Sequence, residues 1–348
     1  MKILDRFLPL WIFVSAVMGL SLGIFFPQIL SFWEALEYHN INFALALGLI
    51  IMLYPPLAKA DYSRVFEAFE NKKLLGISLV LNWLVGPVLM FALAFLCYVL
   101  FPPFSAEYMQ GVILIGLARC IAMVLVWTDL ALGDRNYALG LVALNSLFQI
   151  LFFSLYAYVF MVFLPSQLGI SLQSYSISIA SIAKNVGIYL GIPFVLGLLS
   201  RVLIVKAKGL GFYENTFLPT ISPLSLVALL YVIIVMFSYK GESLIRLPFD
   251  TLLVSVPLIA YFVIMFFLSF YISKAFNYAK RVATSFSACG NNFELSLAIA
   301  IVSFGISSPQ SFVSVVGVLI EVPVMIALAS WLKYKRKSAP ECYNGKNA

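Results

Sequence analysis

Ten long apolar runs occupy most of the chain, and they restrict its fold more than any other feature. A helix that crosses a bilayer needs roughly 20 mostly apolar residues. Only 11% of the residues are charged, whereas soluble proteins carry about 25%. We therefore predict an all-α polytopic membrane protein with ten transmembrane helices. The runs cover residues 7–30, 40–58, 73–101, 108–132, 136–164, 180–204, 217–239, 249–275, 281–304 and 310–333.

Basic residues lie mostly on one side of these predicted spans. Of the 22 lysines and arginines, 18 fall in the loops and tails that share a side with the N-terminus. Lys240 and Arg246 fall in the opposite loops, and Arg119 and Lys184 fall inside spans. Cytoplasmic loops of membrane proteins carry an excess of lysine and arginine. We expect a multi-pass protein of the cell (plasma or inner) membrane with both termini in the cytoplasm.

The two halves of the chain repeat one arrangement of polar residues. A polar interruption around Cys120 precedes Asn145 by 25 residues, and a second around Asn292 precedes Glu321 by 29. Five helices per half is an odd number, so the second half would enter the membrane inverted. We predict a 5+5 inverted repeat with discontinuous helices four and nine. Its parts are residues 1–165, residues 166–333 and a cytoplasmic tail at 334–348.

Cys120 is the first candidate for substrate binding. It lies in the middle of a span directly after Arg119, and a neighbouring cation favours the thiolate form of cysteine, which binds metals. A buried cysteine can also be an ordinary packing residue. Arg119 could instead cap carbonyl groups of a broken helix, or pair with Glu294 or Glu321. Cys289 lies at the matching break of helix nine, and its contact with substrate stays open.

The densest polar cluster in any span is formed by Asn291, Asn292 and Glu294. Polar side chains at membrane depth are costly and mark functional sites. Amide and carboxylate oxygens could replace part of a cation's hydration shell or bind hydroxyl groups. The alternative is that these side chains repair a helix broken near Gly290 through interhelical hydrogen bonds.

Glu321 is the sharpest single candidate, because apolar residues flank it on both sides and Pro323 follows closely. Apolar surroundings favour the protonated form of a carboxyl group, so we expect Glu321 to load and release a proton at cellular pH. The alternative is a structural carboxylate paired with Arg119 or Lys184. Asp129 and Asp134 are interpreted as residues of a cytoplasmic loop.

Several function classes are excluded by what the spans contain. The cysteines at 97, 120, 289 and 342 and the single histidine, His39, lack the paired spacing of a zinc site. No phosphate-binding motif of the GxxxxGK[ST] type is present, and no hydrolase set of Ser/His, metal-His or paired Asp falls within the spans. We predict a secondary transporter, neither an enzyme nor a nucleic-acid-binding protein, with no cofactor.

The chain resembles the arsenical-resistance-3 family of arsenite efflux permeases, within the bile/arsenite/riboflavin transporter superfamily. The residues that carry the resemblance are the run 119–134, the stretch 141–149 and the motifs at 290–295 and 321–324, with further matches at 4–23 and 188–193. Thr128 departs from the family pattern, which usually has Asn there. This departure bears on substrate preference rather than on class.

The resemblance implies a ten-helix carrier with a panel and a core domain, which exports trivalent arsenic, and sometimes antimony, in exchange for protons. The family's essential cysteine falls on Cys120 and its essential glutamate on Glu321. We expect Cys120 to contact As(III), together with Arg119, Asn145 and the cluster Asn291, Asn292 and Glu294. One thiol would bind the thiophilic metalloid reversibly, whereas three would hold it too tightly. The rival interpretation is a sodium-coupled organic-anion symporter of the same fold.

Overall fold

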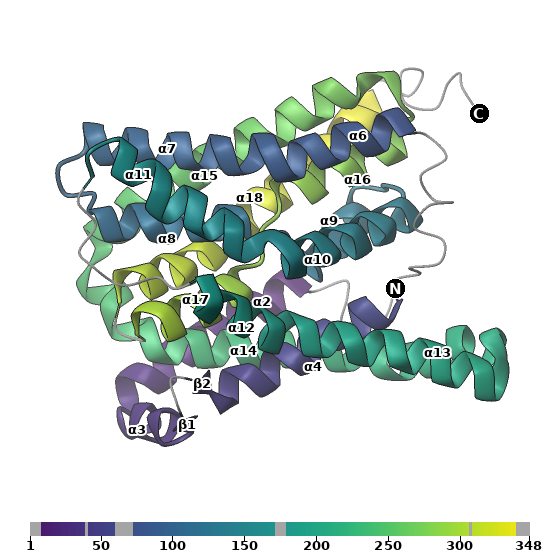
Figure 1. Ribbon diagram of the computed structural model, residues 1–348, viewed down its shortest axis with the longest axis horizontal. Coiled ribbons are helices and arrows are strands. Elements are labelled where there is room, and N and C mark those ends of the chain that lie inside the picture. The colour runs from purple at the N-terminus through teal and green to yellow at the C-terminus, as the bar shows by residue number, and fades with distance from the viewer. Residues whose placement is uncertain (1–7, 39–40, 60–71, 171–178, 306–307, 339–348) are drawn as a thin grey trace.

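The computed structural model describes residues 8–38, 41–59, 72–170, 179–305 and 308–338, and these are almost entirely helical (Figure 1). Within these ranges, one short antiparallel pair joins β1 (Glu37–Tyr38) to β2 (Ile41–Asn42). This confirms the all-α class. The helices are α2 (Leu8–Phe25), α3 (Gln28–Ala35), α4 (Phe43–Lys59), α6 (Lys72–Val80), α7 (Gly86–Leu100), α8 (Ala106–Leu117), α9 (Met123–Leu130), α10 (Arg135–Tyr158), α11 (Leu164–Gln167), α12 (Ile179–Val186), α13 (Ile192–Phe212), α14 (Leu218–Arg246), α15 (Pro248–Ile272), α16 (Tyr278–Cys289), α17 (Phe293–Phe304) and α18 (Pro309–Ser338).

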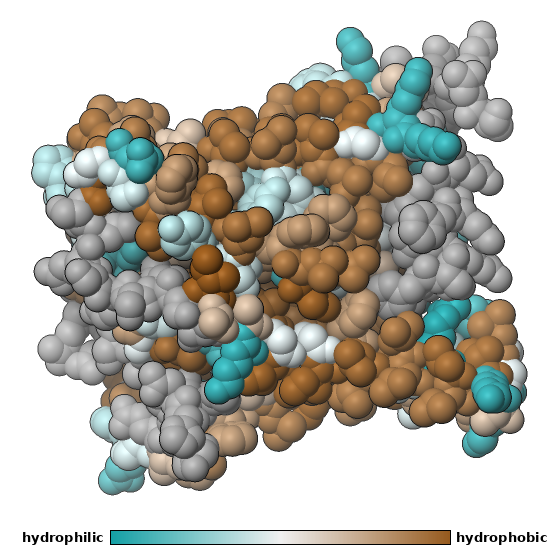
Figure 2. Space-filling model, in the orientation of Figure 1, coloured by the Kyte–Doolittle hydropathy of each residue, from teal (hydrophilic) through white to brown (hydrophobic). Residues whose placement is uncertain are grey.

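Apolar helices of membrane-spanning length are the main component of the structure. In the described part of the chain, five helical segments are long and apolar enough to cross a membrane: Lys72–Leu100, Arg135–Gln167, Ile182–Tyr239, Pro248–Ala275 and Pro309–Arg336. Four more apolar helices have 10–17 residues: Leu10–Phe25, Phe43–Lys59, Ala106–Leu117 and Phe293–Phe304. The face in Figure 2 is largely hydrophobic, and its hydrophilic side chains gather near the edges. These features support a polytopic membrane protein.

The helices form two groups. α2, α4, α13 and α14 pack side by side in the lower part of Figure 1 and are called here the four-helix layer. The second group, called here the crossing bundle, lies above this layer in Figure 1 and is held together by contacts of α7 with α8 and of α15 with α16 and α18. It touches the four-helix layer through contacts of α18 with α14 and of α17 with α4. The other members of the crossing bundle are α9, α10 and α17.

Wide helical turns allow four prolines inside or at the ends of spans. At each of these turns a backbone N–H bonds to the carbonyl five residues earlier instead of four. Proline cannot donate a hydrogen bond and its ring clashes with the carbonyl four residues before it, so the extra residue in the turn lets the helix continue. The turns are Leu81–Val85, Val159–Phe163, Gly187–Gly191 and Tyr213–Phe217, and the prolines that follow are Pro87, Pro165, Pro193 and Pro219.

Two of the expected breaks are shorter than predicted. The helix after span six continues past residue 204, but the chain leaves helical geometry at Gly209, whose φ of 83° glycine adopts without strain, so this expected break lies at Gly209. α14 also continues past residue 239 to Arg246. The boundaries after residues 165 and 333 stay predictions; α11 runs across the first and α18 across the second.

Candidate functional site

Two broken helices cross inside the bundle. α8 ends at Leu117 before α9 begins at Met123, and α16 ends at Cys289 before α17 begins at Phe293. The two breaks run antiparallel: Cys120 N donates to Gly290 O at 3.3 Å, and Asn292 N donates to Ala118 O at 3.0 Å. Each break thus supplies partners for backbone groups that the other leaves without helical bonds, as non-helical backbone at membrane depth requires.

Two side-chain amides complete the crossing. Asn291 Nδ2 donates to Ile115 O at 2.8 Å and to Ala118 O at 3.2 Å. Gln149 of α10 accepts from Arg119 N at 3.0 Å and donates to Arg119 O at 3.1 Å, so its amide acts like a neighbouring strand. Asn291 therefore repairs the broken helices, which was one of the two interpretations left open.

The Arg119 guanidinium also serves the break. It is completely buried, and its Nη1 donates to Tyr261 Oη at 2.9 Å and to Ala288 O at 3.1 Å. A Cβ on Gly86 would lie 2.9 Å from this nitrogen, so the close approach depends on glycine. Among the described residues, no ion pair joins Arg119 to a carboxylate. Of the two alternatives left open for Arg119, the structure favours carbonyl capping at the end of α16 over pairing with Glu294 or Glu321.

Cys120 lies where the first break turns into α9. Its side chain is 4% exposed, and its Sγ accepts a hydrogen bond from Val124 N at 3.2 Å. Gly290 permits this position, since a Cβ there would be 3.1 Å from Cys120 Cβ. Cys289 has other contacts: its Sγ lies 3.8 Å from Met325 Sδ of α18 and 3.8 Å from Phe286 O. The two thiols thus point to different neighbours, and the sulfur of Cys120 bonds to backbone rather than to Arg119.

Glu321 joins α18 to the crossing. It is completely buried, its Oε1 accepts from Asn291 N at 3.4 Å, and its Oε2 has no partner among the described residues. Glu294 is 6% exposed in the first turn of α17, where the helix dipole favours a carboxylate. Asn292 caps the same helix, since its Oδ1 accepts from Leu295 N at 3.0 Å. The predicted polar cluster therefore gathers at one place.

Asn145 belongs to a different network. Its Oδ1 accepts from Trp83 Nε1 at 3.0 Å, and its Nδ2 donates to Asn82 Oδ1 at 3.3 Å and to Ser287 Oγ at 3.2 Å. These bonds tie α10 to α16 and to the wide turn after α6. Both polar atoms of the Asn145 side chain are engaged in hydrogen bonds between helices. In this structure neither atom is left free to bind a substrate.

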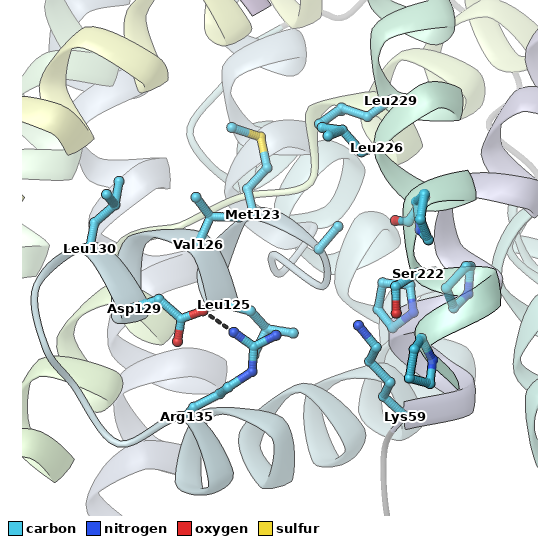
Figure 3. A pocket seen from close by; sticks show the side chains of 16 residues that line it. Lys59, Met123, Leu125, Val126, Asp129, Leu130, Arg135, Ser222, Leu226 and Leu229 are labelled. Atoms are coloured by element: carbon cyan, nitrogen blue, oxygen red, sulfur yellow. Dashed lines mark hydrogen bonds and ion pairs between the residues drawn. The ribbon is translucent and has the colours of Figure 1, made fainter. Parts of the chain in front are cut away.

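A cavity of about 670 Å³ lies between the crossing bundle and the four-helix layer, lined by parts of α4, α9, α10 and α14 (Figure 3). Lys59, Asp129 and Arg135 are its charged lining residues. Asp129, expected in a loop, lies in the last turn of α9 and forms an ion pair with Arg135. The lining includes Ala122, two residues after Cys120, but not Cys120 itself. The cavity thus borders the break that carries the thiol.

The sequence analysis assigned no role to Gln149 or Tyr261, whose side chains bond to Arg119. A glutamine inside an apolar span was the sequence signal that could have identified Gln149. The cavity walls were not predicted. Among the described residues, no three His, Cys, Asp or Glu side chains gather closely enough to hold a metal ion; His39 and Cys342 lie outside the described residues.

Comparisons with known proteins agree with this geometry. Residues 46–247 match the sodium bile acid symporter family. The chain is 45% identical to the arsenical-resistance protein Acr3 of Corynebacterium glutamicum, over 93% of this chain and 87% of that protein. It is 33% identical to the Acr3 of Alkaliphilus metalliredigens, over 97% and 94%, and 31% identical to the uncharacterized transporter slr0944 of Synechocystis, over 96% and 89%. The chain is therefore a membrane transporter and not an enzyme, and it belongs to the arsenical-resistance-3 family of arsenite efflux permeases.

Proposed function

We propose that this protein exports trivalent arsenic from the cytoplasm across the plasma membrane in exchange for protons, with arsenite as substrate and antimonite as the second candidate. The observation that carries the proposal is the position of Cys120. This thiol lies at the crossing of two helix breaks, two residues before Ala122, which lines a cavity of about 670 Å³. Soft thiolate ligands select soft metal and metalloid centres.

We infer the transport route from topology. Ten spans in two inverted halves, with both termini in the cytoplasm, would place Lys59, Asp129 and Arg135 on the cytoplasmic side. The cavity would then open to the cytoplasm. The four-helix layer corresponds to the panel domain that the resemblance implies, and the crossing bundle to the core. Rocking of one against the other would expose the crossing to the outside.

The chemistry at Cys120 is a ligand exchange on arsenic. Arsenous acid, As(OH)₃, gives up one hydroxyl, the thiol gives up its proton, an As–S bond forms and water leaves. Hydrolysis of the same bond on the outer side releases the substrate. One thiol makes this exchange reversible, and Cys289 adds no second As–S bond because its sulfur packs against Met325.

We assign the proton to Glu321. Its Oε1 accepts from the backbone of Asn291, so its charge acts directly on the crossing. Glu321 releases a proton to the cytoplasm when substrate enters, and takes one from outside after substrate leaves. Asn291, Asn292 and Glu294 set the shape and polarity around the thiol, and Arg119 and Asn145 hold the surrounding helices.

Arsenite uptake into everted vesicles tests both roles. With an imposed proton gradient we expect Cys120→Ala and Glu321→Gln to lose uptake, and the control variants Cys97→Ala and Glu214→Gln to keep it. Wild-type rates in Glu321→Gln would exclude the proton role. Wild-type rates in Cys120→Ala would exclude the thiol.

The second candidate, sodium-coupled symport of an organic anion, has support in the matching family's description. Against it, Asn291 Nδ2 and Asn292 Oδ1 are engaged in hydrogen bonds at the helix breaks, although Asn291 Oδ1 has no partner among the described residues. A sodium requirement for flux, or failure of the expressed protein to confer arsenite resistance, would favour this candidate.

A further inference from the structure

The cavity has two chemically different walls (Figure 3). One is α9, which follows Cys120 directly. The other, called here the acceptor wall, belongs to the four-helix layer. It consists of Pro55 and Pro56 of α4 and Pro219, Ser222, Pro223 and Ser225 of α14.

Prolines leave backbone carbonyls on the acceptor wall without their helical donors, because proline has no N–H. Pro56 leaves the carbonyl of Met52 in this state, and Ser225 Oγ donates to that oxygen across the two helices at 2.7 Å. Pro223 leaves the carbonyl of Pro219, which itself lines the cavity. One released carbonyl is thus used to join α4 to α14, and the other belongs to a residue that lines the cavity.

The serines of the wall act as acceptors toward the cavity. Ser222 Oγ donates its hydrogen to Leu218 O at 2.5 Å, and Ser225 Oγ donates to Met52 O. A hydroxyl that donates its hydrogen keeps two acceptor lone pairs. The Pro219 carbonyl adds a third acceptor. Two cationic side chains line the same cavity: Lys59, which belongs to α4 like Pro55 and Pro56, and Arg135, which forms an ion pair with Asp129.

We propose that the acceptor wall binds the hydroxyl groups of the substrate. This inference rests on the proposed function, since it assumes arsenous acid as the substrate. As(OH)₃ presents three O–H donors to three acceptors. The thiol thus recognises the arsenic atom and the four-helix layer recognises its hydroxyls.

Ser222→Ala is the sharpest variant, because it removes one acceptor oxygen and no bond between helices. Thr220→Ala is its matched control: Thr220 Oγ1 donates to Thr216 O at 2.7 Å in the same manner, but the residue does not line the cavity. In everted vesicles we expect Ser222→Ala to raise the KM for arsenite about 2- to 10-fold, which is the loss of affinity expected when one hydrogen bond is removed. Its kcat should stay near that of Thr220→Ala, and Ser222→Thr should restore the KM.

Two further measurements isolate the wall from the thiol. Pro223→Ala restores an N–H that can bond the Pro219 carbonyl, so it should raise the KM as well. Boric acid, a neutral trihydroxide without affinity for thiols, should compete with arsenite in the wild type and less in Ser222→Ala. Equal KM values for Ser222→Ala and Thr220→Ala, or equal competition by boric acid in the wild type and in Ser222→Ala, would overturn the inference. If the wild type moves no arsenite, the proposed function fails instead.

Discussion

Gln149 holds the crossing of the two helix breaks, and its replacement should be among the most damaging single changes in the protein. The side chain makes two hydrogen bonds to the backbone of Arg119, at 3.0 and 3.1 Å. Both residues are completely buried, so water cannot replace these bonds in Gln149→Leu. An unsatisfied buried polar group costs about 1–3 kcal/mol. With an N–H and a C=O both orphaned, we expect the free energy of unfolding to fall by about 2–6 kcal/mol.

The effect is measured by heating the protein in detergent and following the loss of the monodisperse peak in size-exclusion chromatography. Gln167→Leu is the matched control, because Gln167 is exposed at the end of α11. We also expect Gln149→Leu to abolish arsenite transport, since the backbone before Cys120 loses its support. A midpoint equal to that of Gln167→Leu would refute the assignment of Gln149 as a backbone partner of the break.

Three further predictions address packing, the polar network and access. A Cβ on Gly317 would overlap the Phe293 ring, so Gly317→Ala should destabilise the protein by about 1–3 kcal/mol, whereas Gly76→Ala, with open space around it, should not. Asn145→Ala should lower stability by about 1–3 kcal/mol and leave the KM for arsenite unchanged; a raised KM would place Asn145 in the substrate site. Ser222→Cys should react with a polar maleimide faster in inside-out than in right-side-out vesicles, and the reverse order would contradict a cytoplasmic opening.

Much of the fold could be predicted because apolar periodicity and charge placement are local in sequence. The helices lie within a few residues of the predicted runs, and the interruptions at Cys120 and Asn292 are the actual breaks. Prolines were harder to interpret. The expected end of span five at Pro165 is helical, because a wide turn before the proline removes the clash that would have ended the helix.

The direction of buried side chains could not be predicted. Cys120, Asn291 and Glu321 were expected near one another, because each is a polar residue at an interruption of a span or inside an apolar run. In the structure Cys120 N bonds to Gly290 O, and Asn291 N bonds to the Glu321 carboxylate. The position of the Arg119 guanidinium instead depends on a hydrogen bond to Tyr261 and on the space left by the missing side chain of Gly86. Those residues lie in other helices, and no pattern around Arg119 identifies them.

A carrier for a thiophilic substrate must bind it and also release it, and the division of the cavity offers a physical route to both. On the proposals above, Cys120 and Glu321 belong to the crossing bundle, whereas Ser222 and the other acceptors belong to the four-helix layer. Movement of one group against the other separates these contacts, so the hydroxyl bonds break before the As–S bond is hydrolysed. Release then proceeds in two smaller steps. The hydrogen bonds that hold Arg119 lie within the crossing bundle, so the thiol moves with its own scaffold and stays correctly placed.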